Sequence, residues 1–263
     1  MAEFGGVPAV VRPPAGGERA DAPVVVAWHL LDPPRNERAL AAALPLAGLD
    51  AWKIYLGLPL SGSRLPPGGE AEIQQRIADD PVLRLHRPIV QGGFEEFPGA
   101  LAAARRELGL AGDGPIGLLG GSMGSAVAQL VLAEAGAPVR AAVLVSPVTR
   151  MRATINGLAR HFGAEYGWTP PSSAFAERTD FADRADRLAG TPLRYVIGAD
   201  DLREPFLDPL DETVAALERH GGVVDKQVIP GMGHGFFDEA ADQPTPAAAT
   251  IDELATDWFR KHL

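Results

Sequence analysis

Short apolar runs alternate along most of the chain with stretches whose apolar residues recur at helical spacing. The uncharged run Val24–Trp28 is typical of a strand buried inside a sheet. Val7–Arg12, which two prolines follow, is typical of an edge strand. Further strands are predicted at 51–55, 116–119, 141–145, 193–197 and 223–229, and helices at 38–46, 70–77, 95–108, 125–133, 210–220 and 250–262. Because strands that alternate with helices form a mostly parallel sheet covered on both faces, we expect a single α/β domain over residues 1–263.

One segment, at about 147–190, is longer than a single crossover helix requires. It contains five of the aromatic residues: Phe162, Tyr166, Trp168, Phe175 and Phe181. Two interpretations stay open. The segment is either a small cap insertion over the carboxyl ends of the strands, where open α/β sheets bind ligands, or a long crossover whose aromatic residues pack in a core of their own.

The composition narrows the classes of partner and of chemistry. The formal net charge is −10, whereas a nucleic-acid-binding protein would be expected to present a basic face. The chain has no cysteine, which excludes disulfides, thiolate metal sites and a cysteine nucleophile. The first residues lack a basic segment followed by an apolar one, so no signal peptide is predicted. No apolar run approaches the length that spans a membrane. We therefore expect a cytoplasmic protein with no membrane or nucleic-acid partner; the oligomeric state is left open.

The predicted strand 116–119 runs directly into Gly120-Gly121-Ser122-Met123-Gly124, and a helical pattern follows. A strand, then G-x-S-x-G, then a helix is the pattern of a nucleophile elbow, a sharp turn that presents one serine hydroxyl at the top of a sheet. Glycine is needed where the strand and the helix cross closely. The alternative is a glycine-rich turn with an idle serine.

The other groups that a serine nucleophile requires come later in the chain. A serine hydroxyl needs a neutral imidazole to take its proton and a carboxylate to hold that imidazole in the right tautomer. Asp200 and Asp201 follow the strand 193–197, and His234 follows the final strand, framed by glycines in IPGMGHGF. The order Ser, Asp, His with each residue after a strand predicts a catalytic triad of Ser122, Asp201 or Asp200, and His234.

The remaining histidines are interpreted as surface or structural residues: His86, His161, His220 and His262. None forms a metal-ligand spacing such as H-E-x-x-H, so no catalytic metal is expected. No G-K-[ST] follows the glycines near Ser122 and no G-x-G-x-x-G pattern fits, so no nucleotide cofactor is expected either.

The segments GGSMG, VIGADD and IPGMGHGF together resemble those of α/β-hydrolase-fold serine hydrolases, from Val24 to the last helix. The chain is most similar to bacterial carboxylesterases and to the hydrolase domains of dienelactone hydrolases and prolyl oligopeptidases. It has serine where dienelactone hydrolases have cysteine. No propeller domain precedes the hydrolase region in this sequence, which disfavours a true oligopeptidase.

The resemblance also implies the finer roles. In such enzymes the acid commonly lies three residues after a strand-ending glycine, and counting from Gly198 gives Asp201. A His-Gly-x turn after an early strand supplies one oxyanion donor. The matching segment His29-Leu30-Leu31 keeps the histidine and lacks the glycine. The implied donors are the backbone N–H groups of Leu31 and Met123, with Leu30 as an alternative.

The sequence therefore predicts a cofactor-free serine hydrolase that cleaves a carboxylic ester, thioester or lactone of a small molecule through an acyl-enzyme on Ser122. Two alternatives stay open: an amidase or peptidase that uses the same triad, and a catalytically silent binding protein that uses the pocket as a receptor. Arg150, Arg152 and Arg160, near the predicted cap, either attract an acidic substrate or form a solvated face.

Overall fold

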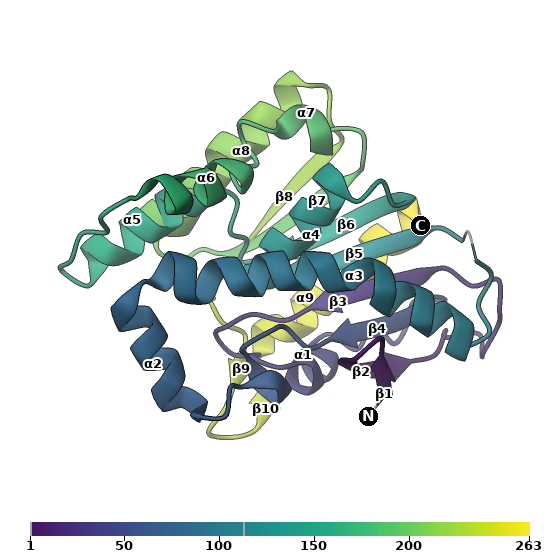
Figure 1. The fold of residues 1–263 in the computed structure, drawn as a ribbon. Helices are drawn as coiled ribbons and strands as arrows, with labels where there is room; N and C mark the ends of the chain where they lie inside the picture. Colours follow the sequence, from purple (N-terminus) through teal and green to yellow (C-terminus); the bar gives the residue numbers. More distant parts are fainter. Residues whose placement is uncertain (1, 113) are drawn as a thin grey trace.

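The computed structural model describes residues 2–112 and 114–263 (Figure 1). Its main sheet has the spatial order β1 (Ala2–Phe4), β2 (Val7–Arg12), β4 (Trp52–Leu56), β3 (Val24–Trp28), β5 (Ile116–Gly121), β6 (Val139–Val145), β7 (Leu193–Gly198) and β8 (Val224–Ile229). The pairs β1–β2 and β2–β4 are antiparallel, and all the other neighbours in this sheet are parallel. The predicted α/β fold with a mostly parallel central sheet is confirmed.

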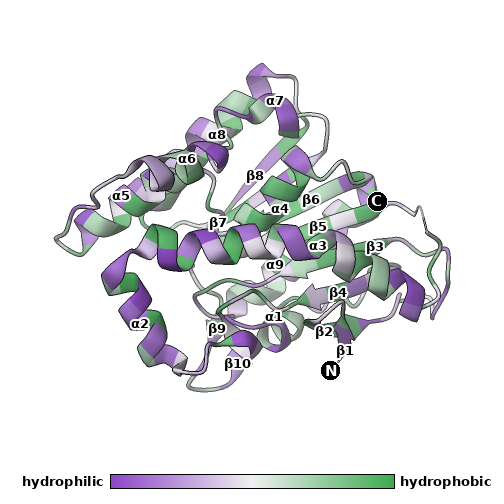
Figure 2. Ribbon diagram, in the orientation of Figure 1, coloured by the Kyte–Doolittle hydropathy of each residue, from purple (hydrophilic) through white to green (hydrophobic). Residues whose placement is uncertain are grey.

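Helices cover both faces of the sheet because the central strands are apolar on both sides. In β3, Val24, Val26 and Trp28 belong to one core cluster, whereas Val25 and Ala27 belong to another. The first cluster includes residues of α2 (Gly69–Asp79), α3 (Arg87–Glu107), α4 (Met123–Glu134) and α8 (Asp208–Arg219), and the second includes residues of α1 (Glu37–Ala43) and α9 (Pro246–His262). Figure 2 shows this pattern as mostly green strands β5 and β6 beneath helices of mixed colour.

Three local expectations differ from the structure. Val7–Arg12 is not the edge strand, because Gly5 and Gly6 adopt positive φ and turn Ala2–Phe4 back to pair with it. The long helix begins at Arg87 rather than at 95, directly after a π-helical turn at Pro81–His86 that the Asp80 side chain caps. A small unpredicted hairpin, β9 (Phe237–Asp238) and β10 (Gln243–Pro244), follows the loop that carries His234.

The segment 147–190 contains α5 (Met151–His161), α6 (Pro170–Arg178) and α7 (Ala185–Leu188). Phe175 and Phe181 are buried, as expected for a long crossover that packs its aromatic residues in a core. Phe162 is 78% exposed, as expected for a cap whose aromatic residues face a ligand site. That the segment acts as a cap stays a prediction. In the described part of the chain no helix is both long and apolar enough to cross a bilayer.

Candidate active site

Ser122 lies in the turn between β5 and α4 with φ +44° and ψ −113°, a conformation that residues other than glycine rarely adopt. The glycines around it are required by close backbone contacts. A Cβ on Gly120 would lie 2.5 Å from the Gly124 carbonyl oxygen, and one on Gly124 would lie 2.4 Å from the Trp28 carbonyl oxygen. These contacts hold the turn tightly and leave the Ser122 side chain free to point out of the strand.

The structure brings Ser122, His234 and Asp201 into one hydrogen-bonded chain. Ser122 Oγ lies 2.9 Å from His234 Nε2, and His234 Nδ1 lies 2.8 Å from Asp201 Oδ2. The second oxygen of Asp201, Oδ1, accepts a 2.8 Å hydrogen bond from the Leu202 backbone N–H. The Asp201 side chain is buried, whereas the His234 ring keeps 15% of its surface exposed. This geometry suits a relay in which the carboxylate orients the imidazole and the imidazole takes the serine proton.

Of the two adjacent carboxylates, Asp201 is the one that contacts His234. Asp200 is exposed, and its backbone N–H donates to the Met232 carbonyl. That bond joins the end of β7 to the histidine loop. The loop approaches so closely at Gly198 that a Cβ there would lie 2.0 Å from the Met232 carbonyl oxygen.

Two further contacts hold His234 in place. The Ser146 hydroxyl, at the end of β6, donates a 2.7 Å hydrogen bond to the His234 backbone carbonyl. Ser146 is fully buried and adopts φ +44°. On the ring itself, Phe206 stacks with a centroid separation of 4.1 Å. Sequence reasoning did not identify Ser146 as part of this site; it directly follows a predicted strand, but that position alone does not distinguish it from other serines.

The two backbone groups implied as oxyanion donors are unpartnered. Among the described residues, neither the Leu31 nor the Met123 N–H donates to a backbone or side-chain acceptor. The Leu30 N–H donates to the Pro34 carbonyl at 3.3 Å, so this alternative donor is already engaged. Leu30 keeps a negative φ, so the leucine in place of the expected glycine imposes no left-handed strain.

His29 supports this loop from inside the protein. Its ring is fully buried, with Nδ1 2.6 Å from the Leu30 carbonyl oxygen and Nε2 accepting a 3.1 Å hydrogen bond from the Leu58 N–H. Burial lowers the pKa of His29 to about 4. The imidazole is therefore neutral near pH 7, donates from Nδ1 and links the loop after β3 to the loop after β4.

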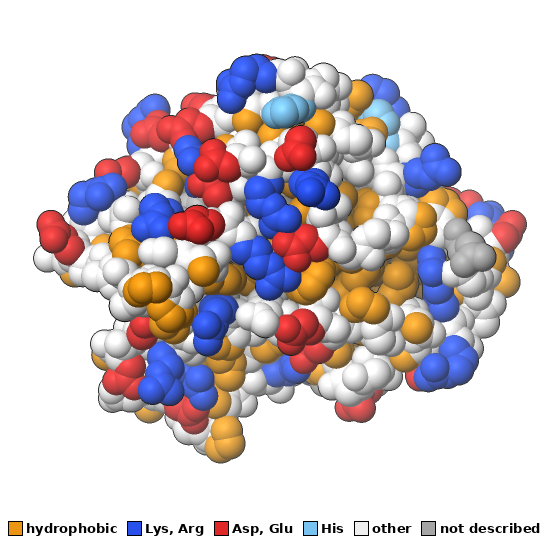
Figure 3. Space-filling model, turned by 45° about the horizontal axis from the view of Figure 1, so that its top comes forward, with side chains coloured by type: hydrophobic (Ala, Val, Ile, Leu, Met, Phe, Trp, Pro, Cys, Tyr) orange, Lys and Arg blue, Asp and Glu red, His pale blue; other side chains and the backbone are white. Residues whose placement is uncertain are grey.

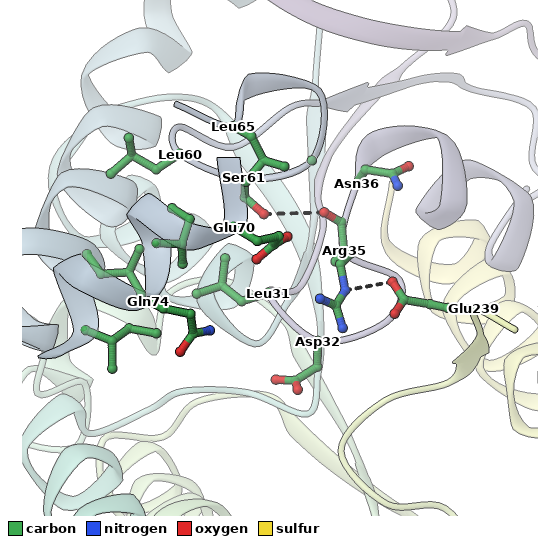
Figure 4. A pocket seen from close by; sticks show the side chains of 14 residues that line it. Leu31, Asp32, Arg35, Asn36, Leu60, Ser61, Leu65, Glu70, Gln74 and Glu239 are labelled. Atoms are coloured by element: carbon green, nitrogen blue, oxygen red, sulfur yellow. Dashed lines mark hydrogen bonds and ion pairs between the residues drawn. The ribbon is translucent and has the colours of Figure 1, made fainter. Parts of the chain in front are cut away.

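A cavity of about 280 Å³ opens over Ser122. His86 and His161, which the sequence suggested were surface or structural residues, both line it. Their positions could not be read from local pattern, because their helical segments reach the site only through tertiary packing. A second cavity of about 460 Å³ shares Leu31 and Asp32 with the first (Figure 4). There Arg35 pairs with Glu239.

The arginines near α5 are engaged with other side chains. Arg150 pairs with Asp180 and Glu212, Arg160 pairs with Glu204, and Arg152 lies over the Trp168 ring. On the face drawn in Figure 3, acidic and basic side chains are interspersed. These contacts favour the solvated-face interpretation over the recruitment of an acidic substrate. Within residues 2–112 and 114–263, no group of three or more His, Asp or Glu side chains is arranged to hold a metal ion.

The fold together with the serine, histidine and aspartate at its strand ends defines a serine hydrolase of the α/β-hydrolase class. The chain belongs to the prolyl oligopeptidase family (Peptidase_S9), whose sequence pattern it matches over residues 90–263. No curated protein matches the chain significantly.

Solved structures with a similar fold include TT1662 from Thermus thermophilus, with 23% identity and a TM-score of 0.71 over 99% of this chain and 95% of that one. An acylaminoacyl peptidase from Pyrococcus horikoshii has 16% identity and a TM-score of 0.65, over 98% of this chain and 40% of that one. A puromycin-hydrolyzing peptidase from Mycobacterium tuberculosis has 21% identity and a TM-score of 0.62, over 95% of this chain and 36% of that one. This chain thus spans well under half the length of either peptidase.

Proposed function

We propose that this serine hydrolase cleaves a carboxylic ester, thioester or lactone of a small molecule through an acyl-enzyme on Ser122. The observation that carries the proposal is the hydrogen-bonded chain from Ser122 Oγ through His234 to the buried Asp201 carboxylate. A binding protein would need none of these three groups, so their hydrogen-bonded arrangement disfavours a catalytically silent receptor. A cytoplasmic location stays part of the proposal.

In the first half of the reaction, Ser122 Oγ attacks the scissile carbonyl carbon while His234 Nε2 accepts the hydroxyl proton. The negative charge that forms on the carbonyl oxygen is stabilised by the N–H groups of Leu31 and Met123, the two unpartnered donors beside Ser122. His234 then gives its proton to the departing alcohol or thiol. In the second half, His234 takes a proton from the water that attacks the acyl-enzyme and returns it to Ser122 Oγ as the acid is released.

The second candidate function is hydrolysis of an amide or peptide bond by the same three residues. Membership of the prolyl oligopeptidase family supports it. Two neighbours of similar fold are also described as peptidases, but this chain spans 40% and 36% of their lengths. The segment IPGMGHGF around His234 resembles those of bacterial carboxylesterases and of prolyl oligopeptidase hydrolase domains alike, so it is compatible with either bond.

The test is labelling by a fluorophosphonate together with turnover of a p-nitrophenyl ester and of the p-nitroanilide with the same acyl group. We expect labelling and ester turnover, both lost in Ser122→Ala. Turnover of the anilide at a comparable kcat/KM would favour the amidase. Strong labelling and intact hydrolysis in Ser122→Ala would contradict the assignment.

A matched pair of variants tests the acid. Asp201→Asn should leave the fold intact and lower kcat by orders of magnitude, since the wrong histidine tautomer is then favoured; about 10⁴-fold is the precedent in a serine protease. Asp200→Asn is the control and should keep nearly the parent kcat, because Asp200 is exposed and joins the histidine loop through its backbone. If Asp200→Asn lowers kcat and Asp201→Asn does not, Asp200 is the carboxylate that orients His234. If both variants keep the parent kcat, neither carboxylate has this role and the triad assignment is wrong.

A further inference from the structure

A third cavity, of about 700 Å³, continues from the one over Ser122. We call it the side cleft. It lies between the segment from α2 to the π-helical turn Pro81–His86 on one wall and α5 with the loop after it on the other. The residues common to both cavities are Leu31, His86, Leu158 and Phe162. A substrate bound at Ser122 can therefore extend past these four residues into the side cleft.

The position of the side cleft relative to His234 indicates which part of a substrate would enter it. The leaving group takes its proton from His234 Nε2, so it must depart on the side of that ring. Leu202, Phe206 and His234 line the cavity over Ser122 but not the side cleft, whereas Leu31, the proposed oxyanion donor, lines both. The side cleft thus lies on the acyl side of the scissile bond.

The walls of the side cleft favour an uncharged apolar group. They include the apolar side chains of Leu85, Ile155, Leu158 and Phe162, of which Leu158 and Phe162 also line the catalytic cavity. Phe162, which lines both cavities, is 78% exposed, so its ring is accessible to a ligand. The lining also includes Asp79, Asp80 and Glu165, and no lysine or arginine is among the described residues that line the cleft. A carboxylate at the end of an acyl chain would therefore be repelled.

His86 provides one hydrogen-bonding group at the junction of the two cavities. Its Nδ1 is buried without a partner, and within the described residues the other ring nitrogen makes no hydrogen bond either. Burial lowers the pKa of His86 to about 4, so the ring is neutral at working pH. A buried N–H without an acceptor is costlier than an unpaired acceptor nitrogen, so the proton belongs on Nε2. His86 then offers an N–H donor to a ligand.

We propose that the side cleft binds the acyl part of the substrate, with an apolar chain or ring against Leu158 and Phe162 and a hydrogen-bond acceptor of that acyl group on His86. The substrate class is an ester or amide whose uncharged, extended acyl group carries an oxo group or similar acceptor near the scissile carbonyl. This inference rests on the proposed function.

The first test varies the acyl chain and the alcohol separately. We expect kcat/KM to rise from p-nitrophenyl acetate to the octanoate by about fourfold for each methylene that the cleft buries, and the 8-carboxyoctanoate to lose most of this gain. Lengthening the alcohol of an acetate ester should have little effect. Ala159→Phe, which fills the side cleft from α5, should lower the octanoate-to-acetate ratio at least tenfold, whereas Ala153→Phe on the same helix should preserve it.

The second test addresses His86 with p-nitrophenyl octanoate and its 4-oxo and 5-oxo analogues. We expect one oxo analogue to gain about three- to tenfold in kcat/KM over the octanoate in the parent. His86→Phe should lose this gain and His86→Gln should recover part of it, since glutamine keeps an N–H donor. Comparing ratios between variants cancels the intrinsic reactivity of the esters.

The outcomes separate this inference from the proposed function. If acetate is hydrolysed but chain length has no effect, if the alcohol carries the chain-length dependence, or if Ala159→Phe leaves the ratio unchanged, the side cleft does not bind the acyl group. If the parent and His86→Phe show the same ratio of kcat/KM between the oxo analogue and the octanoate, His86 does not bind the acceptor of the acyl group. If no ester or amide is turned over and Ser122 is not labelled, the proposed function itself fails.

Discussion

Ser146→Ala tests whether a buried hydroxyl outside the triad positions its histidine. The Ser146 hydroxyl donates to the His234 backbone carbonyl at 2.7 Å, a normal length for an O–H···O bond. Ser146 N–H donates to the Val196 carbonyl, so the residue joins the ends of β6 and β7 to the histidine loop. Alanine keeps the Cβ and with it the left-handed backbone strain at φ +44°. The substitution therefore removes the hydroxyl contact and leaves the steric demands of the turn unchanged.

Two energies bound the expected effect. A neutral hydrogen bond contributes about 0.5–1.5 kcal/mol to stability, and a buried acceptor left unpaired costs about 1–3 kcal/mol. We expect Ser146→Ala to lower the free energy of unfolding by about 1–2 kcal/mol. If half of this loss, about 0.5–1 kcal/mol, appears as displacement of His234, kcat falls by about two- to fivefold, since about 1.4 kcal/mol corresponds to a factor of ten. KM for a short ester should not change, because Ser146 does not line the cavity over Ser122.

The assay compares kcat, KM, the rate of fluorophosphonate labelling and the urea midpoint. Thr213→Ala is the control, since the buried Thr213 hydroxyl also donates to a backbone carbonyl, at 2.8 Å, but within α8. It should lose comparable stability and keep the parent kcat. Ser146→Gly should relieve the strain at φ +44° and still lose activity. If Ser146→Ala destabilises the protein like Thr213→Ala while kcat and labelling stay at the parent values, Ser146 is only structural.

Two further predictions concern the loops that carry the site. Gly198→Ala should abolish turnover and lower the urea midpoint, because its Cβ would lie 2.0 Å from the Met232 carbonyl oxygen and force the histidine loop away from β7; Gly190→Ala, where a Cβ meets nothing within 4 Å, should do neither. The pKa of His29 is lowered from an ordinary 6.5 to about 4 in the native protein. Between these pH values the unfolded chain therefore binds a proton at His29 that the native protein does not bind. The contribution of His29 to the free energy of unfolding is thus fully present above pH 6.5 and is lost as the pH falls toward 4. His29→Gln should remove up to about 3 kcal/mol of this pH-dependent loss in urea titrations, and an unchanged pH dependence would contradict a buried neutral ring.

The sequence was informative where local pattern decides the structure. The strands at Val24–Trp28 and Val7–Arg12 have the predicted bounds because their residues are apolar or β-branched and prolines or a loop end them. The order of Ser122, Asp201 and His234 could be predicted because each follows a strand of a parallel sheet, and the carboxyl ends of such strands meet at one edge. The fold class could be predicted because strand and helix patterns alternate along the chain.

What the sequence did not reveal depends on distant contacts. Ala2–Phe4 is too short to be predicted as a strand and exists because β2 offers it an edge. The position of His86 beside the catalytic cavity depends on how a helical turn 36 residues before Ser122 packs against α2, α3 and α6, and no local periodicity encodes that. Ser146 resembles any serine after a strand until the His234 loop is folded over it.

Leu30, which stands where the family resemblance implied a glycine, packs directly on Gly121 of the elbow. A Cβ on Gly121 would lie 2.1 Å from Leu30 Cδ1, so the second glycine of the elbow provides the space that the leucine side chain occupies. Leu30 is fully buried there. Leu30 directly precedes Leu31, and Gly121 lies two residues before Met123, so this contact joins the two segments that carry the proposed oxyanion donors. The spacing between the two N–H groups thus depends on how closely Leu30 packs on Gly121, and any side chain at position 121 would push them apart.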